Sequence, residues 1–375
     1  MRHVYDLSRL RVLLVEDSDN LRRTLQIMLE ALGVGDVVTA RNGLEAIEKL
    51  STDSQYNKTR CRNVDIILSD YMMDTLDGLK LLSWVRESSD SPNRFMPMIL
   101  MSGAAENDIV SQARDNGVNE FIAKPFTAGT IKSRILAVIN RPRQFVATTS
   151  YFGPDRQRKQ VLEKVADRRR SAEERHGKVI YSFDRVIRPQ IEGEVYFYRM
   201  RNRLKELAAG LNAYGTGDLP EDVLDEANSI LNAGAEDFKD MAYDYLQEMS
   251  ELCEEALSLD EKDRAETFEA LHNLAQELRG QGGTFGYPLI TDIGRTLFEV
   301  IGTNCPRTDT TIAIFQAHID TMKAVMRQEL RNDGGTLGRD LLASLDKAIA
   351  KKLKPVTLGG RMENSDKAIE AAAVA

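Results

Sequence analysis

The stretch VDIILSD, residues 64–70, decides the fold of the first part of the chain. It is short, apolar and rich in β-branched residues, which is typical of a parallel strand buried on both faces. The loop YMMDTLDG, residues 71–78, follows it and opens the next helix. Because open α/β sheets place their chemistry at the carboxyl ends of parallel strands, the last residue of the stretch, Asp70, is the first candidate for a functional side chain.

Apolar segments alternate between strand and helix patterns on both sides of this stretch. Five successive βα units predict a doubly wound α/β domain with a five-stranded parallel sheet and helices on both faces. The predicted strands are residues 11–15, 37–40, 64–70, 98–101 and 120–123, and the predicted helices are residues 20–32, 43–50, 78–87, 109–116 and 128–140.

Charged and hydroxyl side chains follow the ends of four of these strands. Glu16 and Asp17 follow the first, Asp70 ends the third, Ser102 follows the fourth and Lys124 follows the fifth. Three neighbouring carboxylates cannot all ionise without a compensating cation, and hard oxygen ligands select Mg²⁺. One carboxylate then remains free to act as a nucleophile and form an acyl phosphate. The set therefore predicts a phosphoryl-transfer site.

Residues 10–140 resemble a CheY-like receiver domain, a flavodoxin-like fold found in bacterial two-component response regulators. The resemblance is carried by five pieces in the expected order, which are Glu16-Asp17, Asp70, Asp77-Gly78, Ser102-Gly103 and Lys124-Pro125-Phe126. Several motifs on the right elements are far more specific than any one of them alone.

The resemblance implies a role for each matching residue. Asp70 would be the phosphoacceptor, and Mg²⁺ would be held by Glu16, Asp17, Asp70 and the backbone carbonyl of Met72. Ser102 and Phe121 would form the switch, and Lys124 would bind the phosphoryl group. The implied partner is a sensor histidine kinase or a histidine-containing phosphotransfer (HPt) protein. Met72 and Ala104 offer no group to orient an attacking water, so we expect a long-lived aspartyl phosphate.

A hydrolase is the alternative for the same region. Asp74-Thr75-Leu76-Asp77-Gly78 loosely resembles the nucleophile loop of haloacid-dehalogenase-like phosphatases. That loop needs its two carboxylates two residues apart directly after the strand, whereas Asp74 and Asp77 are three apart and follow Asp70. The receiver interpretation is therefore favoured, and the chain is expected to be a phosphoacceptor signalling protein rather than an enzyme with turnover.

The remaining chain divides into a charged connector, a helical region and a tail. We assign residues 1–140 to the receiver, 141–220 to the connector, 221–354 to an all-α bundle and 355–375 to a flexible tail. The run from Arg156 to Arg175 mixes both charge signs, which favours a solvated linker over a nucleic-acid patch. The aromatic and β-branched residues between Val179 and Met200 require a packing partner that the sequence does not identify. The bundle helices are predicted at residues 221–232, 235–257, 260–283, 288–301, 309–330 and 338–353.

One stretch of the bundle resembles the signature of HPt domains. In that signature a basic residue follows the phosphorylated histidine by three positions and glycines follow it by four and ten, which Arg279, Gly280 and Gly286 match if position 276 is the reference. Residues three and four apart share a helix face. Position 276 is Gln276, however, and an amide has no basic lone pair for phosphoryl transfer. The resemblance therefore implies a pseudo-HPt output module, which either binds the receiver in one of its states or binds a downstream signalling protein.

Phosphotransfer through His272, one turn earlier on the same face, is an alternative. In that register Ala275 and Gln276 occupy the basic and glycine positions, so the match is lost. A bundle with another role and a DNA-binding output are further alternatives. The helical half shows no basic recognition helix, which disfavours DNA.

Composition limits the remaining classes of function. The chain has 375 residues, enough for two domains, and its formal net charge of −8 gives no general attraction to nucleic acid or anionic lipid. Three dispersed cysteines and four dispersed histidines favour a reducing compartment and disfavour a thiolate or histidine metal centre. No apolar stretch is long enough for a membrane span or a signal peptide. We therefore expect a cytoplasmic protein, and the sequence leaves open whether it forms a homodimer.

Overall fold

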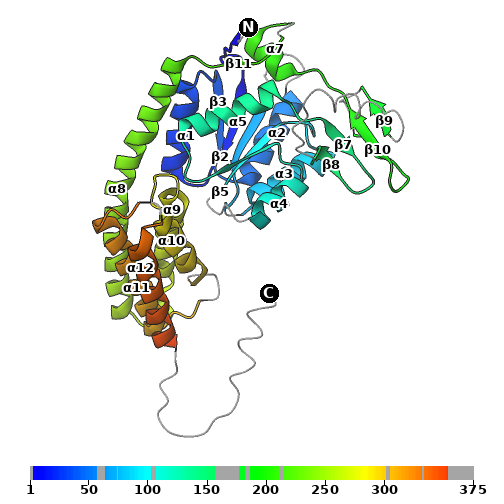
Figure 1. Cartoon of the computed structure of the whole chain (residues 1–375). Helices are drawn as coiled ribbons and strands as arrows, with labels where there is room; N and C mark the ends of the chain where they lie inside the picture. Colours follow the sequence, from blue (N-terminus) through cyan, green and yellow to red (C-terminus); the bar gives the residue numbers. More distant parts are fainter. Residues whose placement is uncertain are drawn as a thin grey trace.

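The computed structural model describes most of the chain as an α/β region, a small connector sheet and a helical bundle (Figure 1). The predicted tail, the charged run from Arg156 to Arg175 except for Arg156 itself, Asp74, Gly103 and Ala104 lie outside the described residues. The residues that the structure describes are 3–56, 64–73, 75–102, 107–156, 177–181, 186–211, 214–300, 305–331 and 333–353.

A parallel sheet of five strands, counted among the described residues, is the centre of the α/β region. The strand order is β3-β2-β4-β5-β6, and each neighbouring pair is parallel. This arrangement confirms the predicted doubly wound sheet. The strands are β2 (Arg11–Val15), β3 (Asp36–Ala40), β4 (Ile66–Asp70), β5 (Met98–Ser102) and β6 (Glu120–Ala123).

Helices cover both faces of this sheet because its strands are apolar on both sides. Val12 and Leu14 of β2 belong to the core beneath one pair of helices, whereas Leu13 and Val15 belong to the core on the opposite face. The first pair is α1 (Asp19–Ala31) and α5 (Ala128–Asn140), and the opposite face carries α2 (Gly43–Tyr56), α3 (Gly78–Glu87) and α4 (Asn107–Asp115).

The connector contains a second sheet, which supplies the packing partner that the sequence left open. Its strand order is β8-β7-β10-β9. Phe95, Phe145, Phe152 and Tyr198 pack together in its core, with ring centroids 5.0–5.7 Å apart. The connector sheet therefore packs on the α/β region through Phe95, which precedes β5. The strands are β7 (Phe145–Ala147), β8 (Phe152–Pro154), β9 (Gly177–Ile180) and β10 (Val195–Tyr198).

A buried arginine lies beside this aromatic cluster. Arg86 of α3 donates to the carbonyl oxygens of Gly117, Arg94 and Met96 and to Oδ1 of Asn119, at 2.8–3.1 Å. Its guanidinium also lies 5.2 Å from the centre of the Phe145 ring. Burial lowers the pKa of Arg86 to about 9, so the side chain stays charged at neutral pH.

The first helix of the bundle is continuous, and the predicted division between residues 232 and 235 is wrong. Helix α8 (Glu221–Ser258) has 38 residues and passes through Asn232 and Gly234 without a break. A Cβ at Gly234 would lie 3.0 Å from Cγ2 of Thr24 in α1, so the glycine allows the two helices to approach closely. The predicted helix break is instead a site of helix packing.

The other bundle helices agree with the predicted ones apart from their ends. The helix expected from Asp260 begins at Ala265, after a short 3₁₀ turn at Glu261–Asp263. The last helix begins at Gly335, three residues earlier than predicted. These helices are α9 (Ala265–Gly282), α10 (Pro288–Val300), α11 (Asp309–Arg327) and α12 (Gly335–Leu353). A shorter helix, α7 (Arg203–Ala209), and strand β11 (Gly217–Asp218), which pairs with β1 (His3–Val4), precede α8.

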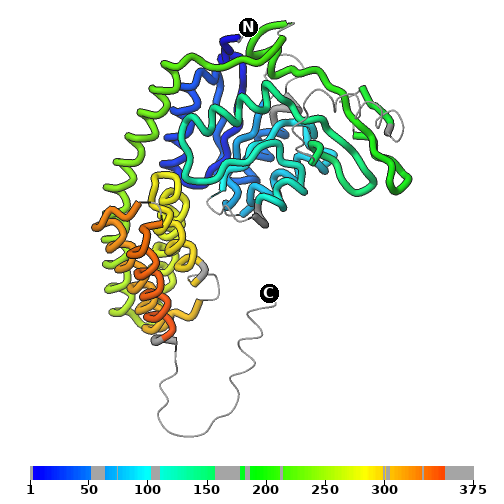
Figure 2. Tube along the Cα trace, in the orientation of Figure 1, coloured from blue at the N-terminus to red at the C-terminus, as the bar shows by residue number. Residues whose placement is uncertain are grey.

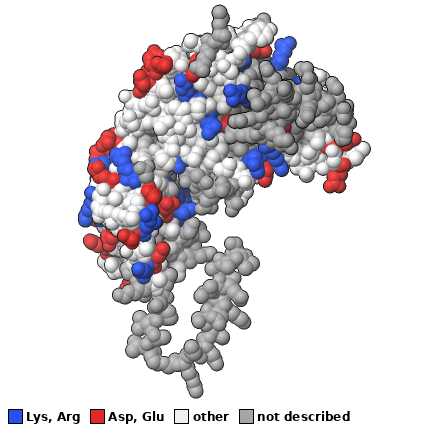
Figure 3. Space-filling view, viewed as in Figure 1, with Lys and Arg blue, Asp and Glu red and all other residues white. Residues whose placement is uncertain are grey.

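Helix α8 joins the α/β region to the bundle. Its first half packs on α1 and α5 and its second half on α9 and α11 (Figure 2). One continuous hydrophobic cluster therefore includes Leu21 and Ile131 of the α/β region together with Phe238 and Leu246 of the bundle side. Basic and acidic side chains are interspersed over the bundle on the face shown in Figure 3. Among the described residues, none of the helices has the length and hydropathy needed to cross a membrane.

Candidate phosphoryl-transfer site

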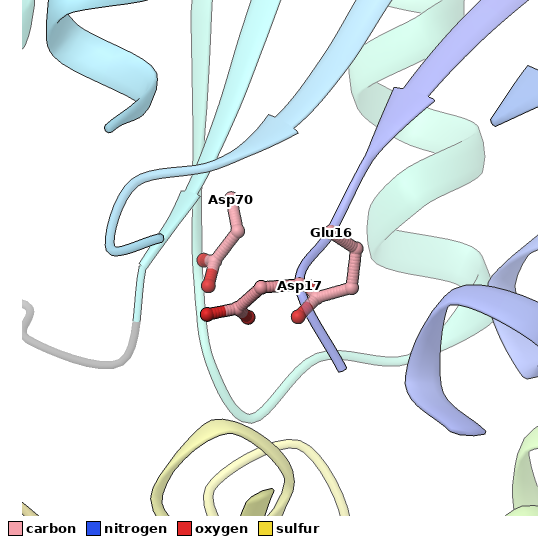
Figure 4. Close-up of side chains that lie close together, drawn as sticks. All are labelled: Glu16, Asp17 and Asp70. Carbon is pink, nitrogen blue, oxygen red and sulfur yellow. The ribbon is translucent and has the colours of Figure 1, made fainter. Parts of the chain in front are cut away.

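Three carboxylates meet at the carboxyl ends of β2 and β4. Glu16 and Asp17 follow β2, Asp70 ends β4, and their side chains point toward one another (Figure 4). One oxygen from each carboxylate lies within 4.8 Å of the others. Because β2 and β4 are adjacent in the sheet, the fold itself brings these side chains together.

A buried lysine compensates part of this negative charge. Nζ of Lys124, the residue after β6, lies 3.2 Å from Oδ1 of Asp70 and 3.4 Å from Oε2 of Glu16. Burial alone would lower the pKa of the ammonium group, but Asp70 and Glu16 raise it above its ordinary value. Lys124 is therefore a permanent cation in this pocket.

One cation does not balance three carboxylates. Burial raises the pKa of Glu16 well above its ordinary value, and it also raises the pKa of Asp70. In both cases Lys124 acts in the opposite direction, while the nearby Asp17 carboxylate adds to the increase. The pocket thus favours an additional cation, and its all-oxygen donor set fits Mg²⁺.

Neighbouring residues hold the acidic loop and the strand end in place. Nη1 of Arg22 in α1 donates to the backbone carbonyls of Glu16 and Asp17, at 2.8 and 3.3 Å. At Gly78 a Cβ would lie only 2.2 Å from the Asp70 carbonyl oxygen, so α3 begins closer to β4 than any side chain allows. Arg22 was not among the predicted site residues, although its position one turn into the helix after the acidic pair was a usable signal.

The other predicted site residues surround this pocket at different depths. Ser102 is buried at the end of β5, and Phe121 is half-buried in β6. Met72 lies in the loop after Asp70 with a side chain that is 40% exposed, and its predicted role concerns only its backbone carbonyl. Asp77 accepts a hydrogen bond from the backbone N–H of Lys80 at 2.7 Å as the N-cap of α3. Asp77 therefore has a structural role as a helix cap, and the phosphatase alternative is not needed to explain why a carboxylate stands at this position.

The HPt-like stretch lies against the mouth of the pocket. Nε2 of Gln276 in α9 donates to Oδ2 of Asp17 at 2.8 Å, and the yellow ribbon of this region passes beside the three carboxylates in Figure 4. Glu277, the next residue, accepts a hydrogen bond from Oγ of Ser18 at 3.0 Å. The sequence pattern singled out Gln276 but gave no sign of its partner, and it missed both Ser18 and Glu277.

Two other residues of the HPt-like surface, Arg279 and His272, contact the neighbouring helix α10. The guanidinium of Arg279 lies 4.2 Å from the centre of the Phe298 ring in α10, and the ring of His272 lies 4.2 Å from the same ring. Gly280 is closest to Ser18, with 3.8 Å between its ideal Cβ position and Cβ of Ser18. The direct contact with the carboxylates is therefore made by Gln276, the residue that the HPt-like register places at the histidine position.

Comparisons with known proteins agree with this geometry. Residues 12–136 match the response regulator receiver domain family. Chemotaxis protein CheY1 of Helicobacter pylori is 32% identical over 130 residues, which cover 35% of this chain and 97% of that protein. Chemotaxis protein CheY-3 of Vibrio cholerae is 27% identical over 132 residues, which cover 35% and 93%. A solved CheX–CheY–BeF3–Mg²⁺ complex from Borrelia burgdorferi shares 26% identity over 34% of this chain and 88% of that chain, with a TM-score of 0.30. The chain therefore belongs, through its N-terminal third, to the response regulator receiver family.

Proposed function

We propose that the protein is a two-component or phosphorelay response regulator that accepts a phosphoryl group on Asp70. A carboxylate oxygen of Asp70 forms the new P–O bond, the P–N bond of a donor phosphohistidine breaks, and the imidazole leaves. The donor is a sensor histidine kinase or an HPt protein. The convergence of Glu16, Asp17 and Asp70 around Lys124 carries this proposal.

The chain's own residues divide the work at this site. Glu16, Asp17, Asp70 and the Met72 carbonyl would hold Mg²⁺, which would supply positive charge next to the phosphoryl oxygens. Lys124 pairs with one of those oxygens once Asp70 carries the phosphoryl group, and the buried hydroxyl of Ser102 donates to another. Phe121, half-buried in the neighbouring strand β6, responds to the movement of Ser102. The product is a modified protein, so we propose no enzymatic turnover.

We propose that the helical bundle is the output module and that it is HPt-like without the phosphorylated histidine. Two observations support this. The spacing of Gln276, Arg279 and Gly280 follows the HPt pattern, and Gln276 is the bundle residue that contacts Asp17. His272 is instead packed on Phe298. Similarity to two proteins named chemotaxis protein supports a signalling role for the receiver.

A small phosphodonor tests the assignment of Asp70. Acetyl phosphate and Mg²⁺ should convert the intact chain to a singly phosphorylated form, while Asp70→Asn should abolish the product. Asp77→Asn is the matched control, because asparagine also caps helices and the site keeps its carboxylates. Equal modification of wild type and Asp70→Asn would overturn the proposal.

Because Met72 supplies no group to orient water, we also expect the aspartyl phosphate to be long-lived, and a half-life of seconds would contradict that expectation.

A further inference from the structure

Helix α9 lies where a phosphodonor has to approach. The pocket of Glu16, Asp17 and Asp70 opens at the carboxyl edge of the sheet, and α9 contacts this edge through two hydrogen bonds between side chains far apart in the sequence. One joins Gln276 to Asp17, and the other joins Ser18 to Glu277. Gln281 also donates to Glu277 at 2.8 Å, which fixes the carboxylate that receives the Ser18 hydroxyl.

The surface of α9 that meets the receiver is shaped for close contact. The contact involves two glycines, Gly280 within α9 and Gly283 directly after its last residue. An ideal Cβ at Gly280 would lie 3.8 Å from Cβ of Ser18, and one at Gly283 would lie 3.9 Å from Cβ of Lys124. These distances are ordinary van der Waals contacts for a methyl group, so a longer side chain at Gly280 would have to displace Ser18 or move α9 away.

Helix α8 supports α9 in this position. Gly234 of α8 packs against Thr24 of α1, and Phe238 stacks on Phe285, just beyond α9, with ring centroids 5.4 Å apart. The hydrogen bonds at the pocket therefore lie at the polar edge of a larger apolar interface between the α/β region and the bundle.

We propose that α9 is an intramolecular cap that occupies the place of the phosphodonor helix over Asp70. Its Gln276 stands where a donor would present its histidine. An amide can hydrogen-bond to the carboxylates but cannot deliver a phosphoryl group, so the docked bundle blocks the site without modifying it. Two helices cannot occupy one surface, so a helix that carries a phosphohistidine reaches Asp70 only after α9 has moved away.

This proposal rests on the proposed function and adds a regulatory step to it. Docking of α9 and phosphorylation of Asp70 oppose each other, and by thermodynamic linkage each weakens the other by the same factor. The undocked bundle then exposes the surface of Gln276, Glu277 and Gly280 to a signalling partner. The phosphorylated protein is therefore the form whose bundle is free to bind.

A designed disulfide tests the docked position. The double variant Ser18→Cys, Gly280→Cys has its two cysteine Cβ atoms 3.8 Å apart, which is the usual Cβ–Cβ separation in a disulfide. The natural Cys61, Cys253 and Cys305 are replaced by serine or alanine, and each single-cysteine variant serves as a control. Mild oxidation should produce an intramolecular disulfide in the double variant alone. Pre-incubation with Mg²⁺ and beryllofluoride, a phosphoryl mimic, should slow its formation at least about fivefold.

The same variant tests whether docking blocks the site. With acetyl phosphate and Mg²⁺, the oxidised protein should be phosphorylated at least about tenfold more slowly than the same protein after reduction. Gly280→Leu should act in the opposite direction and raise the rate above wild type. Asn273→Leu, on an exposed position of the same helix, is the matched control and should leave the rate unchanged.

The possible results separate this proposal from the function on which it rests. Absence of the disulfide would overturn the docked cap. A disulfide that forms but leaves the phosphorylation rate unchanged would show that docking does not block Asp70, which also overturns it. If no variant is phosphorylated, including Gly280→Leu and the reduced protein, the proposed function fails, while disulfide formation still reports whether α9 docks.

Discussion

Two buried cations in the receiver have opposite surroundings. Lys124, at the carboxyl edge of the sheet, faces the carboxylates of Asp70 and Glu16. Arg86, beside the connector sheet, faces backbone carbonyls and one side-chain amide. Burial dominates at Arg86 and lowers its pKa, whereas neighbouring negative charge raises the pKa of Lys124.

The difference shows what distinguishes a reactive charged pocket from a structural one. Around Arg86 each guanidinium nitrogen donates to a neutral acceptor, so the positive charge is stabilised without a carboxylate and the site has no excess negative charge to attract another ion. Around Lys124 the carboxylates outnumber the cation, so the pocket is complete only when a further cation or a chemical change at a carboxylate reduces the excess. Incomplete charge compensation is therefore the property that makes the Asp70 pocket chemically responsive.

Replacing Arg86 should give the largest loss of stability. Arg86→Met removes four hydrogen bonds, and at about 1 kcal/mol for each of them the free energy of unfolding should fall by about 4 kcal/mol. Urea denaturation measures this change. At low temperature the folded fraction should still be phosphorylated at the wild-type rate, and a selective loss of phosphorylation would contradict a purely structural role.

Replacing Lys124 should affect the chemistry more than the fold. Lys124→Met removes the buried positive charge that meets the phosphoryl oxygens, so the rate of Asp70 phosphorylation by acetyl phosphate should fall about 100-fold or more. The rate is measured with saturating Mg²⁺, and urea denaturation verifies that the variant is folded. A wild-type rate in this variant would remove Lys124 from the site.

The acidic pocket should make the metal-free protein less stable as the pH rises. The raised pKa values of Glu16 and Asp70 mean that, from about pH 4 upward to those values, the folded state binds more protons than the unfolded state. The free energy of unfolding of the metal-free protein therefore falls as pH rises through this window, by about 1.4 kcal/mol for each unit of pKa increase.

Urea titrations between pH 4.5 and 7.5 measure this slope. Glu16→Gln should flatten it, and added Mg²⁺ should restore stability mainly at the upper end of the range, where the carboxylates are ionised. Stability that rises with pH in the metal-free wild type, and not in Glu16→Gln, would contradict the assigned direction.

The smallest expected effect is that of a single hydrogen bond at the mouth of the pocket. Gln276→Ala removes the donor to Asp17, which should weaken docking of α9 by about 1 kcal/mol, or roughly fivefold in the docking equilibrium. Hydrogen exchange should show faster exchange at the start of α1 and in α9, with α11 unchanged. Equal exchange in wild type and Gln276→Ala would show that this bond adds nothing to docking.

The sequence predicted those features that depend on local pattern. The continuous apolar runs of strands such as residues 11–15 and the helical period in residues 20–32 located the βα units within two residues, apart from the end of α2 at Tyr56. The rule that parallel strands carry their chemistry at one end then brought Glu16, Asp17, Asp70 and Lys124 together correctly. The HPt-like stretch at the end of α9 could also be recognised from the sequence, because the spacing around Gln276 is a local pattern.

Features that depend on distant contacts were missed or left open. The connector sheet pairs β7 with β10 across about 50 residues, and no local period reveals such a pairing. Gly234 looked like a helix break because its reason for being glycine, the approach of Thr24, lies about 210 positions away in the sequence. The contact between Gln276 and Asp17 could not be predicted for the same reason. Each is a polar side chain that could equally well be exposed to solvent, so neither indicates the other as its partner.

Helix α8 has a mechanical consequence. At 1.5 Å per residue its 38 residues span about 57 Å, and one end packs on α1 and α5 while the other carries the bundle. A tilt of about 10° at the receiver end would displace the distal end by roughly 10 Å. Such a rod would act as a lever, because a small change of orientation at the receiver end would produce a displacement as large as the diameter of a helix.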